Sequence, residues 1–227
     1  MTAAVGLYAN NRLNLPPPTA PATAPIPLVI YGGASAVGTY AIQLAKRSNI
    51  HPIIAIAGRV QDHVTSLLDV SQGDAIIDYR KGNEEIVQGI KAALKGQKLE
   101  YAYDATAGSN SWVNICKVLD HETGKITLVL PPMDDLGGKH KAISASIDQS
   151  MTVMGDVHGP QSDIGYFFSR YFIKGFEEGW FKGQRQEERP GGLEGIEGAL
   201  KRLKDGSASA VKFVFKVADT PGAGSGK

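Results

Sequence analysis

The sequence contains a single cysteine, Cys116, among its 227 residues. One cysteine cannot form an intramolecular disulfide, and it cannot supply a structural zinc site built from several cysteines. This cysteine usage is typical of a reducing compartment, so the expected location is cytoplasmic.

Long hydrophobic runs and an excess of one charge are also absent. No stretch approaches the roughly 18 consecutive apolar residues of a membrane span, and no signal-peptide pattern opens the chain, so no membrane partner is expected. The 24 Lys and Arg residues balance 23 Asp and Glu residues, for a formal net charge of +1. Because no overall field attracts a polyanion, nucleic acid is not expected as a partner, and any phosphate group must be bound locally.

Short apolar segments alternate with segments of helical periodicity from residue 27 onward. This alternation is typical of βαβ units, and it predicts an α/β fold with a doubly wound, Rossmann-type parallel sheet of about six strands. The predicted strands are Leu28–Tyr31, Ile53–Ala57, Ala75–Asp78, Tyr101–Tyr103, Ile126–Leu130 and Thr152–Met154. The predicted helices between them are Val37–Ser48, His63–Leu68, Asn83–Leu94 and Ser111–Leu119.

The two ends of the chain differ from this central region. Prolines from Pro16 to Pro27 interrupt regular structure after a mildly apolar start. Near the other end, Tyr166–Trp180 is aromatic-rich and helical, Leu193–Leu203 is amphipathic, and Val211–Val217 is a predicted strand without an obvious place in the first sheet. The expected division is a linker helix and proline-rich connector (1–26), a dinucleotide-binding domain (27–190), a C-terminal helix and strand (191–219), and a disordered Gly/Ser-rich tail (220–227).

The most informative segment is Leu28–Lys46, a strand that leads into a turn of small residues and then a helix. In a GxGxxG dinucleotide-binding turn, the first glycine makes the bend, the second admits a pyrophosphate, and the third lets the helix pack on the strand. Gly33, Ser35 and Gly38 hold those positions, and serine is small enough to keep the approach open. Backbone N–H groups at the helix start can face a phosphate. The expected donors are the N–H groups of Ser35, Ala36 and Val37.

Three other interpretations of this turn remain open. Gly33 and Gly38 have the spacing of a P-loop, but Thr39 stands where that motif needs lysine. The turn also resembles a GxSxG nucleophile elbow, with His158 available downstream, but Val37 stands where the last glycine should be. In the third interpretation, the small residues only let the helix pack tightly on the strand and bind nothing.

The end of the second predicted strand indicates which dinucleotide would bind. An Asp or Glu there would accept hydrogen bonds from the ribose 2′-hydroxyl and select NAD. The strand ends instead in Gly58 and Arg59, and an arginine offers a bidentate, charge-assisted partner for a 2′-phosphate. The sequence therefore favours NADP, with a solvated loop role for Arg59 as the alternative.

No catalytic side chain can be assigned from the sequence. No tyrosine has a lysine four residues later, as in short-chain reductases, and one cysteine with five histidines does not provide a catalytic zinc site, so no metal is expected. Asp104 is predicted to cap the turn that follows its strand, and Asp156 and His158 are predicted to have a turn or dimer-contact role. The aromatic segment Tyr166–Trp180 is predicted to be a packing helix, and some of its residues could wall an apolar substrate pocket.

Three segments together resemble a known family: Leu28–Lys46, Gly73–Arg80 and Tyr103–Gly108. They resemble the medium-chain reductases of the quinone oxidoreductase and enoyl reductase type, in particular the zinc-free fungal trans-acting enoyl reductases. The resemblance extends over Thr2–Val217. Members of that family begin with a GroES-like domain that supplies most of the substrate pocket and has no counterpart here. The sequence is therefore expected to start mid-protein, with a remnant of a second domain at its two ends.

The resemblance implies an NADPH-dependent oxidoreductase that transfers hydride to an enoyl or quinone-type acceptor, a small-molecule substrate, with this chain supplying the NADPH site. The alternative is a non-catalytic dinucleotide-binding or cofactor-sensing module that lacks the substrate domain. A homodimer through strand 152–154 is also implied. The implied cofactor-binding residues are Gly33, Ala34, Ser35, Ala36, Val37 and Gly38 at the pyrophosphate, Gly58, Arg59 and Tyr79 at the adenosine phosphate, Thr106 and Ala107 in the cleft, and Leu130 and Pro131 at the nicotinamide carboxamide.

Overall fold

The computed structural model describes residues 1–108, 111–131, 140–141 and 143–223. The chain forms two compact units, Met1–Lys182 and Gly183–Lys227. The second unit begins earlier than the boundary expected at residue 190, because Gln186–Arg189 forms a strand that pairs with Lys212–Phe215. Within the described ranges, no helix combines the length and apolar character needed to cross a membrane.

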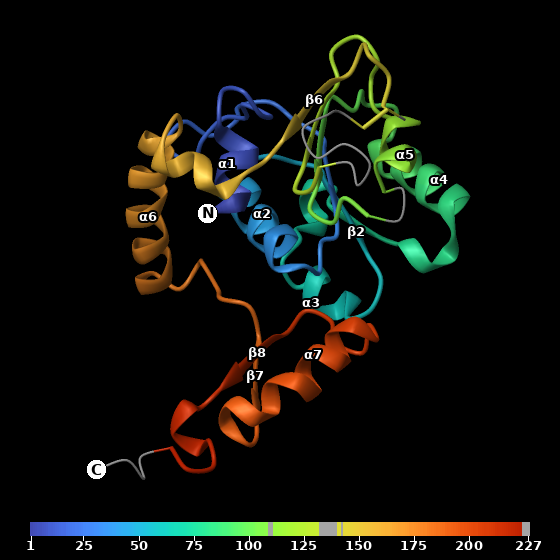
Figure 1. Cartoon of the computed structure of the whole chain (residues 1–227). Helices are drawn as coiled ribbons and strands as arrows, with labels where there is room; N and C mark the ends of the chain where they lie inside the picture. The colour runs from blue at the N-terminus through green and yellow to red at the C-terminus, as the bar shows by residue number, and fades with distance from the viewer. Residues whose placement is uncertain (109–110, 132–139, 142, 224–227) are drawn as a thin grey trace. The chain divides into compact units, whose positions relative to one another are not determined.

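A six-stranded parallel sheet forms the centre of the first unit (Figure 1). Its strand order is β3-β2-β1-β4-β5-β6, so the order reverses at β1, which has β2 on one side and β4 on the other. This is the topology of a doubly wound dinucleotide-binding fold, and the predicted fold class is confirmed. The strands are β1 Leu28–Tyr31, β2 Ile53–Ala57, β3 Ala75–Asp78, β4 Tyr101–Asp104, β5 Lys125–Leu128 and β6 Asp148–Met151.

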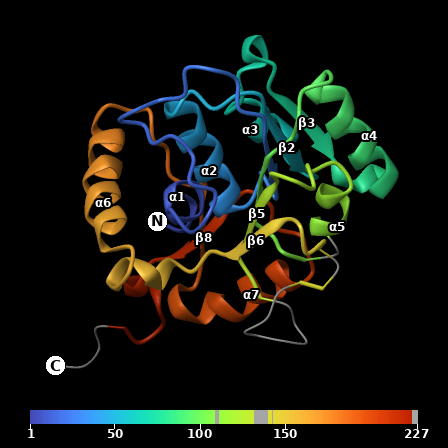
Figure 2. The ribbon, with the colours of Figure 1, turned by 90° about the horizontal axis from the view of Figure 1, so that it is seen from above.

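Helices cover both faces of this sheet (Figure 2). Leu28 and Ile30 of β1 pack in one core with α1 and α2, whereas Val29 and Tyr31 pack in a second core with α4 and α5. Because both faces are covered, β1 and β2 are buried at every position and consist of apolar residues. The helices of this unit are α1 Thr2–Tyr8, α2 Ala36–Arg47, α3 Gln61–Thr65, α4 Asn83–Leu94, α5 Ser111–Cys116 and α6 Ser162–Glu177, with 3-10 turns η1 Val70–Gln72, η2 Tyr79–Lys81 and η3 Met154–His158.

The N-terminal segment is anchored to the first unit. The Tyr8 hydroxyl donates to the Leu44 carbonyl of α2 at 3.0 Å, and the Tyr8 ring stacks on Phe168 of α6 with 5.0 Å between ring centroids. The hydroxyl of the fully buried Tyr103 in β4 donates to the Thr2 carbonyl at 3.0 Å. These contacts hold α1 against two helices and the sheet, so the expected linker helix is an integral part of this unit.

The sixth strand was predicted in the wrong place. The structure has β6 at Asp148–Met151, whereas Thr152–Met154 was expected. An edge strand has only one neighbour and does not need an apolar sequence, and the β6 residues Asp148 and Met151 are exposed. Thr152 is buried, and its hydroxyl is satisfied by a 2.7 Å hydrogen bond with the Thr127 hydroxyl. Val153 and Met154 follow outside the strand. The homodimer through this edge remains a prediction.

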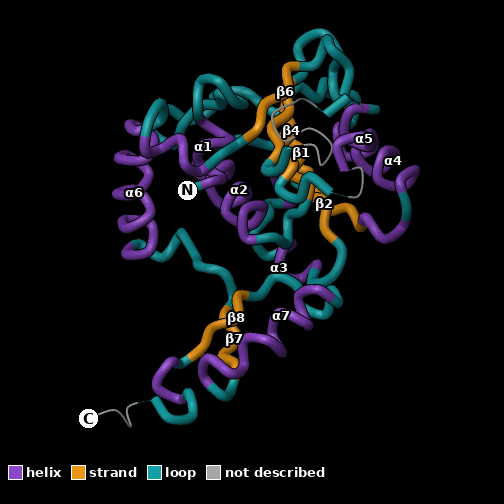
Figure 3. The backbone as a smooth tube through the Cα atoms, viewed as in Figure 1, coloured by secondary structure: helices purple, strands orange, loops and turns teal. Residues whose placement is uncertain are grey.

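In its described residues, 183–223, the second unit contains a parallel pair of strands and one α-helix (Figure 3). β7 Gln186–Arg189 was not predicted, because it contains no apolar residue. Glu187 of β7 accepts hydrogen bonds at 2.6 Å from Arg189 and from Arg202 of the helix. In the tail that was expected to be disordered, the Thr220 hydroxyl accepts from the Leu193 N–H at 2.9 Å, and residues 224–227 lie outside the described residues. The remaining elements are β8 Lys212–Phe215, α7 Ile196–Lys204, η4 Gly192–Gly195 and η5 Val217–Asp219.

Candidate dinucleotide-binding site

The turn between β1 and α2 is bent by a glycine that the sequence pattern did not single out. Gly32 has φ +78°, in the left-handed region that favours glycine, and a Cβ atom there would overlap the Thr106 hydroxyl. The N–H groups of Gly32 and Gly33 both donate to the Ile56 carbonyl, at 2.9 and 3.0 Å, which ties the turn to β2. Ala34 follows, half-buried, in the same turn. The Gly-Gly doublet was the only signal in the sequence for this arrangement.

Gly38 lets α2 approach the turn closely. A Cβ atom on Gly38 would overlap the Gly32 carbonyl oxygen and would lie 2.9 Å from Gly33 Cα. These are backbone atoms, which cannot rotate away as a side chain can. Gly38 therefore has the packing role expected of the third glycine of the motif.

Two backbone donors of the turn remain without a protein partner. Ser35 is the N-cap of α2, and its Oγ accepts from the Gly38 N–H at 3.1 Å. The Ser35 N–H donates to the Gly32 carbonyl at 2.8 Å, so the expectation that it faces a phosphate is corrected. In the described part of the chain, no acceptor is assigned to the N–H groups of Ala36 and Val37. They stand at the positive end of the helix dipole, where an anion is favoured.

Gly58 and Tyr79 come together beyond the ends of β2 and β3. A Cβ atom on Gly58 would lie 2.6–2.9 Å from the ring and hydroxyl of Tyr79, so the absence of a side chain at Gly58 makes room for Tyr79. Tyr79 is 46% exposed, and its ring stacks on Tyr31 at 6.5 Å between centroids. Burial, with smaller contributions from Asp104 and Tyr79, raises the pKa of Tyr31 to about 12. Exposed Arg59 follows Gly58 directly in the chain.

A second arginine at this end, Arg80, was not identified from the sequence. Its guanidinium donates to the Asp78 carboxylate through Nε at 2.9 Å and Nη2 at 2.6 Å. This hydrogen bonding holds the pKa of Asp78 at about 2. Asp78 therefore compensates the charge of Arg80.

Asp104 organises the loop after β4. Its fully buried carboxylate accepts the N–H groups of Thr106 at 3.0 Å and Ala107 at 2.8 Å, and it also accepts the Ser111 hydroxyl. Burial raises the pKa of Asp104, and these hydrogen bonds oppose that shift. The predicted capping role is confirmed. The cap fixes Thr106 beside Gly32, so the loop after β4 adjoins the turn after β1.

Leu130 and Pro131 follow β5 at the same edge. The Leu130 side chain is 50% exposed, and its carbonyl accepts a hydrogen bond from His140 Nε2 at 3.3 Å. His140 is buried, and its ring centroid lies 4.2 Å from the centroid of the Trp112 ring. One backbone acceptor near the expected nicotinamide position is therefore already engaged by a side chain. Residues 132–139 lie outside the described residues.

All the candidate cofactor residues follow the carboxyl ends of parallel strands. In open α/β sheets, this edge is where ligands bind, at the point where the strand order reverses. The turn of β1 stands at that reversal. Along the edge, the residues succeed one another in sheet order: Tyr79 after β3, Gly58 and Arg59 after β2, Gly33 to Gly38 after β1, Thr106 and Ala107 after β4, and Leu130 and Pro131 after β5.

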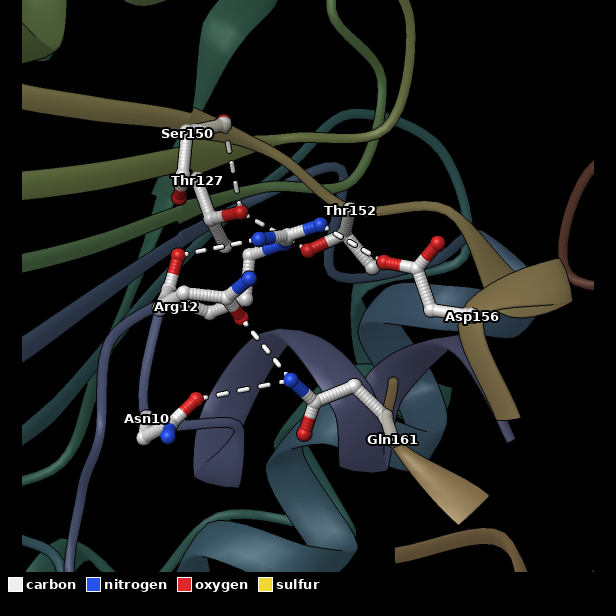
Figure 4. A network of polar contacts seen from close by, with 8 residues as sticks. Asn10, Arg12, Thr127, Ser150, Thr152, Asp156 and Gln161 are labelled. Atoms are coloured by element: carbon white, nitrogen blue, oxygen red, sulfur yellow. Dashed lines mark hydrogen bonds and ion pairs between the residues drawn. The ribbon is translucent and has the colours of Figure 1, made fainter. Parts of the chain in front are cut away.

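Asp156 does not form an acid/base pair. Its carboxylate makes an ion pair with Arg12 at 2.8 Å, in a polar network that joins the N-terminal segment to η3 and α6 (Figure 4). Gln161 contributes by donating to the side-chain oxygen of Asn11 at 3.2 Å. The turn role predicted for Asp156 is confirmed, and its charge is compensated. Within the described residues, no group of three or more His, Cys, Asp or Glu side chains could hold a metal ion.

Sequence relatives of the chain are fungal trans-enoyl reductases. Trans-enoyl reductase fsr4 of Gibberella fujikuroi is 50% identical over 196 residues, which are 86% of this chain and 56% of that protein. Trans-enoyl reductase mpsG of Macrophomina phaseolina is 30% identical over 84% of this chain and 55% of that protein. The chain thus spans little more than half the length of these curated relatives. No family model matches it.

Solved structures share the fold. Escherichia coli quinone oxidoreductase complexed with NADPH superposes with a TM-score of 0.69 at 16% identity, covering 92% of this chain and 60% of that one. The JamJ enoyl reductase in its apo form superposes with a TM-score of 0.66 at 14% identity, covering 94% of this chain and 60% of that one. At these identities the likeness shows the fold, and the sequence relatives add the family. The chain belongs to the family of the fungal trans-enoyl reductases.

Proposed function

We propose that this chain binds NADPH at the carboxyl edge of its sheet and forms the cofactor site of a zinc-free reductase that transfers hydride to an enoyl or quinone-type acceptor. The observation that carries the proposal is the pair of N–H groups at Ala36 and Val37, for which the described residues provide no acceptor, beside a turn where Gly32 and Gly38 allow close backbone packing. An anion is the complementary ligand for two such donors at a helix start. The residues present therefore fit the pyrophosphate of a dinucleotide.

The adenosine end of the proposed site distinguishes the two nicotinamide dinucleotides. No carboxylate follows β2, where one would accept the 2′-hydroxyl of NADH. Arg59 supplies a cation there, and a guanidinium suits the geometry of a 2′-phosphate. Tyr79, half-exposed against Gly58, offers a flat surface and a hydroxyl beside it. Together these residues support a preference for NADPH.

The nicotinamide end would lie between the loops after β4 and β5. When bound, NADPH supplies the hydride, and the protein holds the reactive carbon near the acceptor and excludes side reactions. The Thr106 loop is fixed by Asp104, and the Leu130 carbonyl is fixed by His140. These two loops would orient the carboxamide. Asp104 and Asp156 are both engaged in structural hydrogen bonds, so neither is proposed as the proton donor to the reduced acceptor.

The relatives named trans-enoyl reductases support an enoyl acceptor for the whole protein. The other candidate is a dinucleotide-binding module without catalysis. Calorimetric titration of the chain with NADPH and then NADH tests the cofactor site, and the expected result is saturable binding that is markedly tighter for NADPH. Oxidation of NADPH in the presence of conjugated enones and quinones then distinguishes a reductase from a binding module. No binding of either dinucleotide would overturn the proposal.

A further inference from the structure

A second concave site lies at the opposite end of α2 from the glycine turn. It is a cavity of about 310 Å³ within the first compact unit. Its lining includes Lys46 and Arg47 from the last turn of α2, Leu67 after α3, and Trp180 and Lys182 after α6. Because α2 has 12 residues that each rise about 1.5 Å, this cavity is roughly 16 Å from the β1–α2 turn. It is therefore separate from the proposed dinucleotide site.

The cavity has a cationic lining, and beside it the Glu178 carboxylate accepts a hydrogen bond from the Trp180 indole N–H at 3.1 Å. Three cationic side chains line it, those of Lys46, Arg47 and Lys182, and the lining contains no carboxylate. Within the described residues, none of the three is assigned an ion pair. Asp69 lies outside the lining, and its pKa is lowered chiefly by its hydrogen bond from Ser71, with only a smaller contribution from Lys46. Cations at a helix C-terminus are favoured by the helix dipole. The dipole of α2 therefore accounts for the positions of Lys46 and Arg47, but not for that of Lys182.

Side-chain contacts hold the backbone of Lys182 and the guanidinium of Arg47 in place. Gln43 is buried, and its amide clamps the backbone of Lys182, accepting from the N–H at 2.7 Å and donating to the carbonyl at 3.1 Å. The Arg47 guanidinium lies over the Trp180 ring at 4.9 Å, and its Nε donates to the Tyr171 hydroxyl at 3.4 Å. The segment after α6 is thus fixed to α2 by two independent contacts.

We propose that this cavity binds a small molecule that bears a phosphate or diphosphate group. Three cations balance a group with two or more negative charges, whereas a monocarboxylate would leave most of that charge uncompensated. Lysine and arginine are the side chains that proteins use for phosphate. Leu67 and the indole of Trp180 supply an apolar wall for the rest of such a ligand. A volume of about 310 Å³ is at the lower end of small-molecule sites, which favours a compact ligand over an extended chain.

Inorganic pyrophosphate is the probe that tests this site, and Trp180 is the reporter. In a Trp112→Phe background, Trp180 is the only tryptophan, so its fluorescence reports the cavity. Titration at constant ionic strength is expected to give a saturable change. The double variant Lys46→Gln, Lys182→Gln is expected to weaken pyrophosphate binding by roughly tenfold or more. Lys117→Gln, at an exposed lysine on another part of the surface, is the matched control and should leave the affinity unchanged.

Calorimetry on the unmutated chain and on Ala36→Pro separates this site from the glycine turn. The cavity is expected to bind pyrophosphate with the same affinity in Ala36→Pro, because that change affects only the start of α2. Binding that is lost in Ala36→Pro but retained in the double lysine variant would overturn the cavity proposal and assign the pyrophosphate to the turn. A change without saturation, or one equal in the double variant and Lys117→Gln, would also overturn it. None of these outcomes depends on whether NADPH binds.

Discussion

Gly38 lies so close to Gly32 that a Cβ atom on Gly38 would overlap the Gly32 carbonyl oxygen. The same carbonyl accepts the Ser35 N–H at 2.8 Å, so it is held in position by the turn itself. The start of α2 is thereby pressed against the end of β1. This closeness brings the N–H groups of Ala36 and Val37 to the edge of the sheet.

Gly38→Ala is expected to destabilise the protein. The added methyl group would meet backbone atoms that cannot move without opening the turn, and such overpacking costs about 1–3 kcal/mol. The free energy of unfolding, measured by urea denaturation, checks this. Gly155→Ala is the matched control, because the nearest atom to its Cβ would be Val153 Cγ1 at 3.9 Å. Equal stability of the two variants would contradict the close packing at Gly38.

Ala36→Pro is expected to weaken NADPH binding while the fold is retained. Proline is favoured at the first position of a helix, and Ser35 before it has φ −70° and ψ 159°, which a residue preceding proline readily adopts. The substitution removes one of the two unpartnered donors. A hydrogen bond to a charged group is worth roughly 1.5–3 kcal/mol, so the dissociation constant should rise by about tenfold to a hundredfold.

Ala36→Ser is the control for this change, because it alters the side chain but keeps the N–H. Calorimetry should give it an affinity near that of the unmodified chain. A thermal melt of both variants shows whether the fold survives. Equal NADPH affinity in Ala36→Pro and Ala36→Ser would place the pyrophosphate away from the start of α2.

Sequence patterns predicted β1 to β5 and β8 but failed at β6 and β7. β1 and β2 are continuous apolar segments because helices cover both of their faces. β6 lies at the sheet edge with the sequence Asp-Gln-Ser-Met, and β7 is Gln-Glu-Glu-Arg. Neither has a local signal, because pairing with a distant strand decides its conformation. Such pairing cannot be read from periodicity.

The candidate site could be located from the sequence, but its hydrogen bonding could not. The spacing of Gly33, Ser35 and Gly38 between a strand and a helix was sufficient to find the turn. The hydrogen bond from the Ser35 N–H to the Gly32 carbonyl depends on the backbone conformation of the turn. The pairing of Arg80 with Asp78 likewise depends on side-chain conformations after β3. Residue types identify the site, and the fold decides which of its groups remain available.

Arg59→Gln is expected to weaken NADPH binding by roughly tenfold or more and to leave NADH binding nearly unchanged, because only NADPH carries the 2′-phosphate. Arg80→Gln is the matched control, since Asp78 already compensates that arginine. Its effect on NADPH should be small. Calorimetric titrations of both variants with both dinucleotides provide the comparison. If Arg59→Gln weakened NADPH and NADH binding equally, Arg59 would not be the residue that recognises the phosphate.

Asp104 and Asp120 are expected to affect the pH dependence of stability in opposite directions. Burial raises the pKa of Asp104 above 3.8, so the folded state binds its proton more tightly than the unfolded state does. Its contribution to stability is then greatest in acid and decreases as pH rises from 3.8 through the folded pKa. Asp120 accepts hydrogen bonds from the N–H groups of Thr123 and Glu122. These hydrogen bonds, of which the one from Thr123 contributes most, hold the pKa of Asp120 at about 2. Its contribution is present above 3.8 and is lost as pH falls toward 2.

Asparagine variants separate the two contributions. In Asp104→Asn, the side-chain oxygen can still accept the N–H groups of Thr106 and Ala107, and the amide can donate to the Ser111 hydroxyl, so the loop after β4 should persist. The stability of this variant relative to the unmodified chain should improve as pH rises above 3.8. Asp120→Asn should instead lose relative stability as pH rises from 2 to 3.8 and change little above that. Urea denaturation across the acid range measures both differences. If Asp104→Asn instead lost relative stability as pH increased, the buried carboxylate would be stabilised by its hydrogen bonds more than burial penalises it.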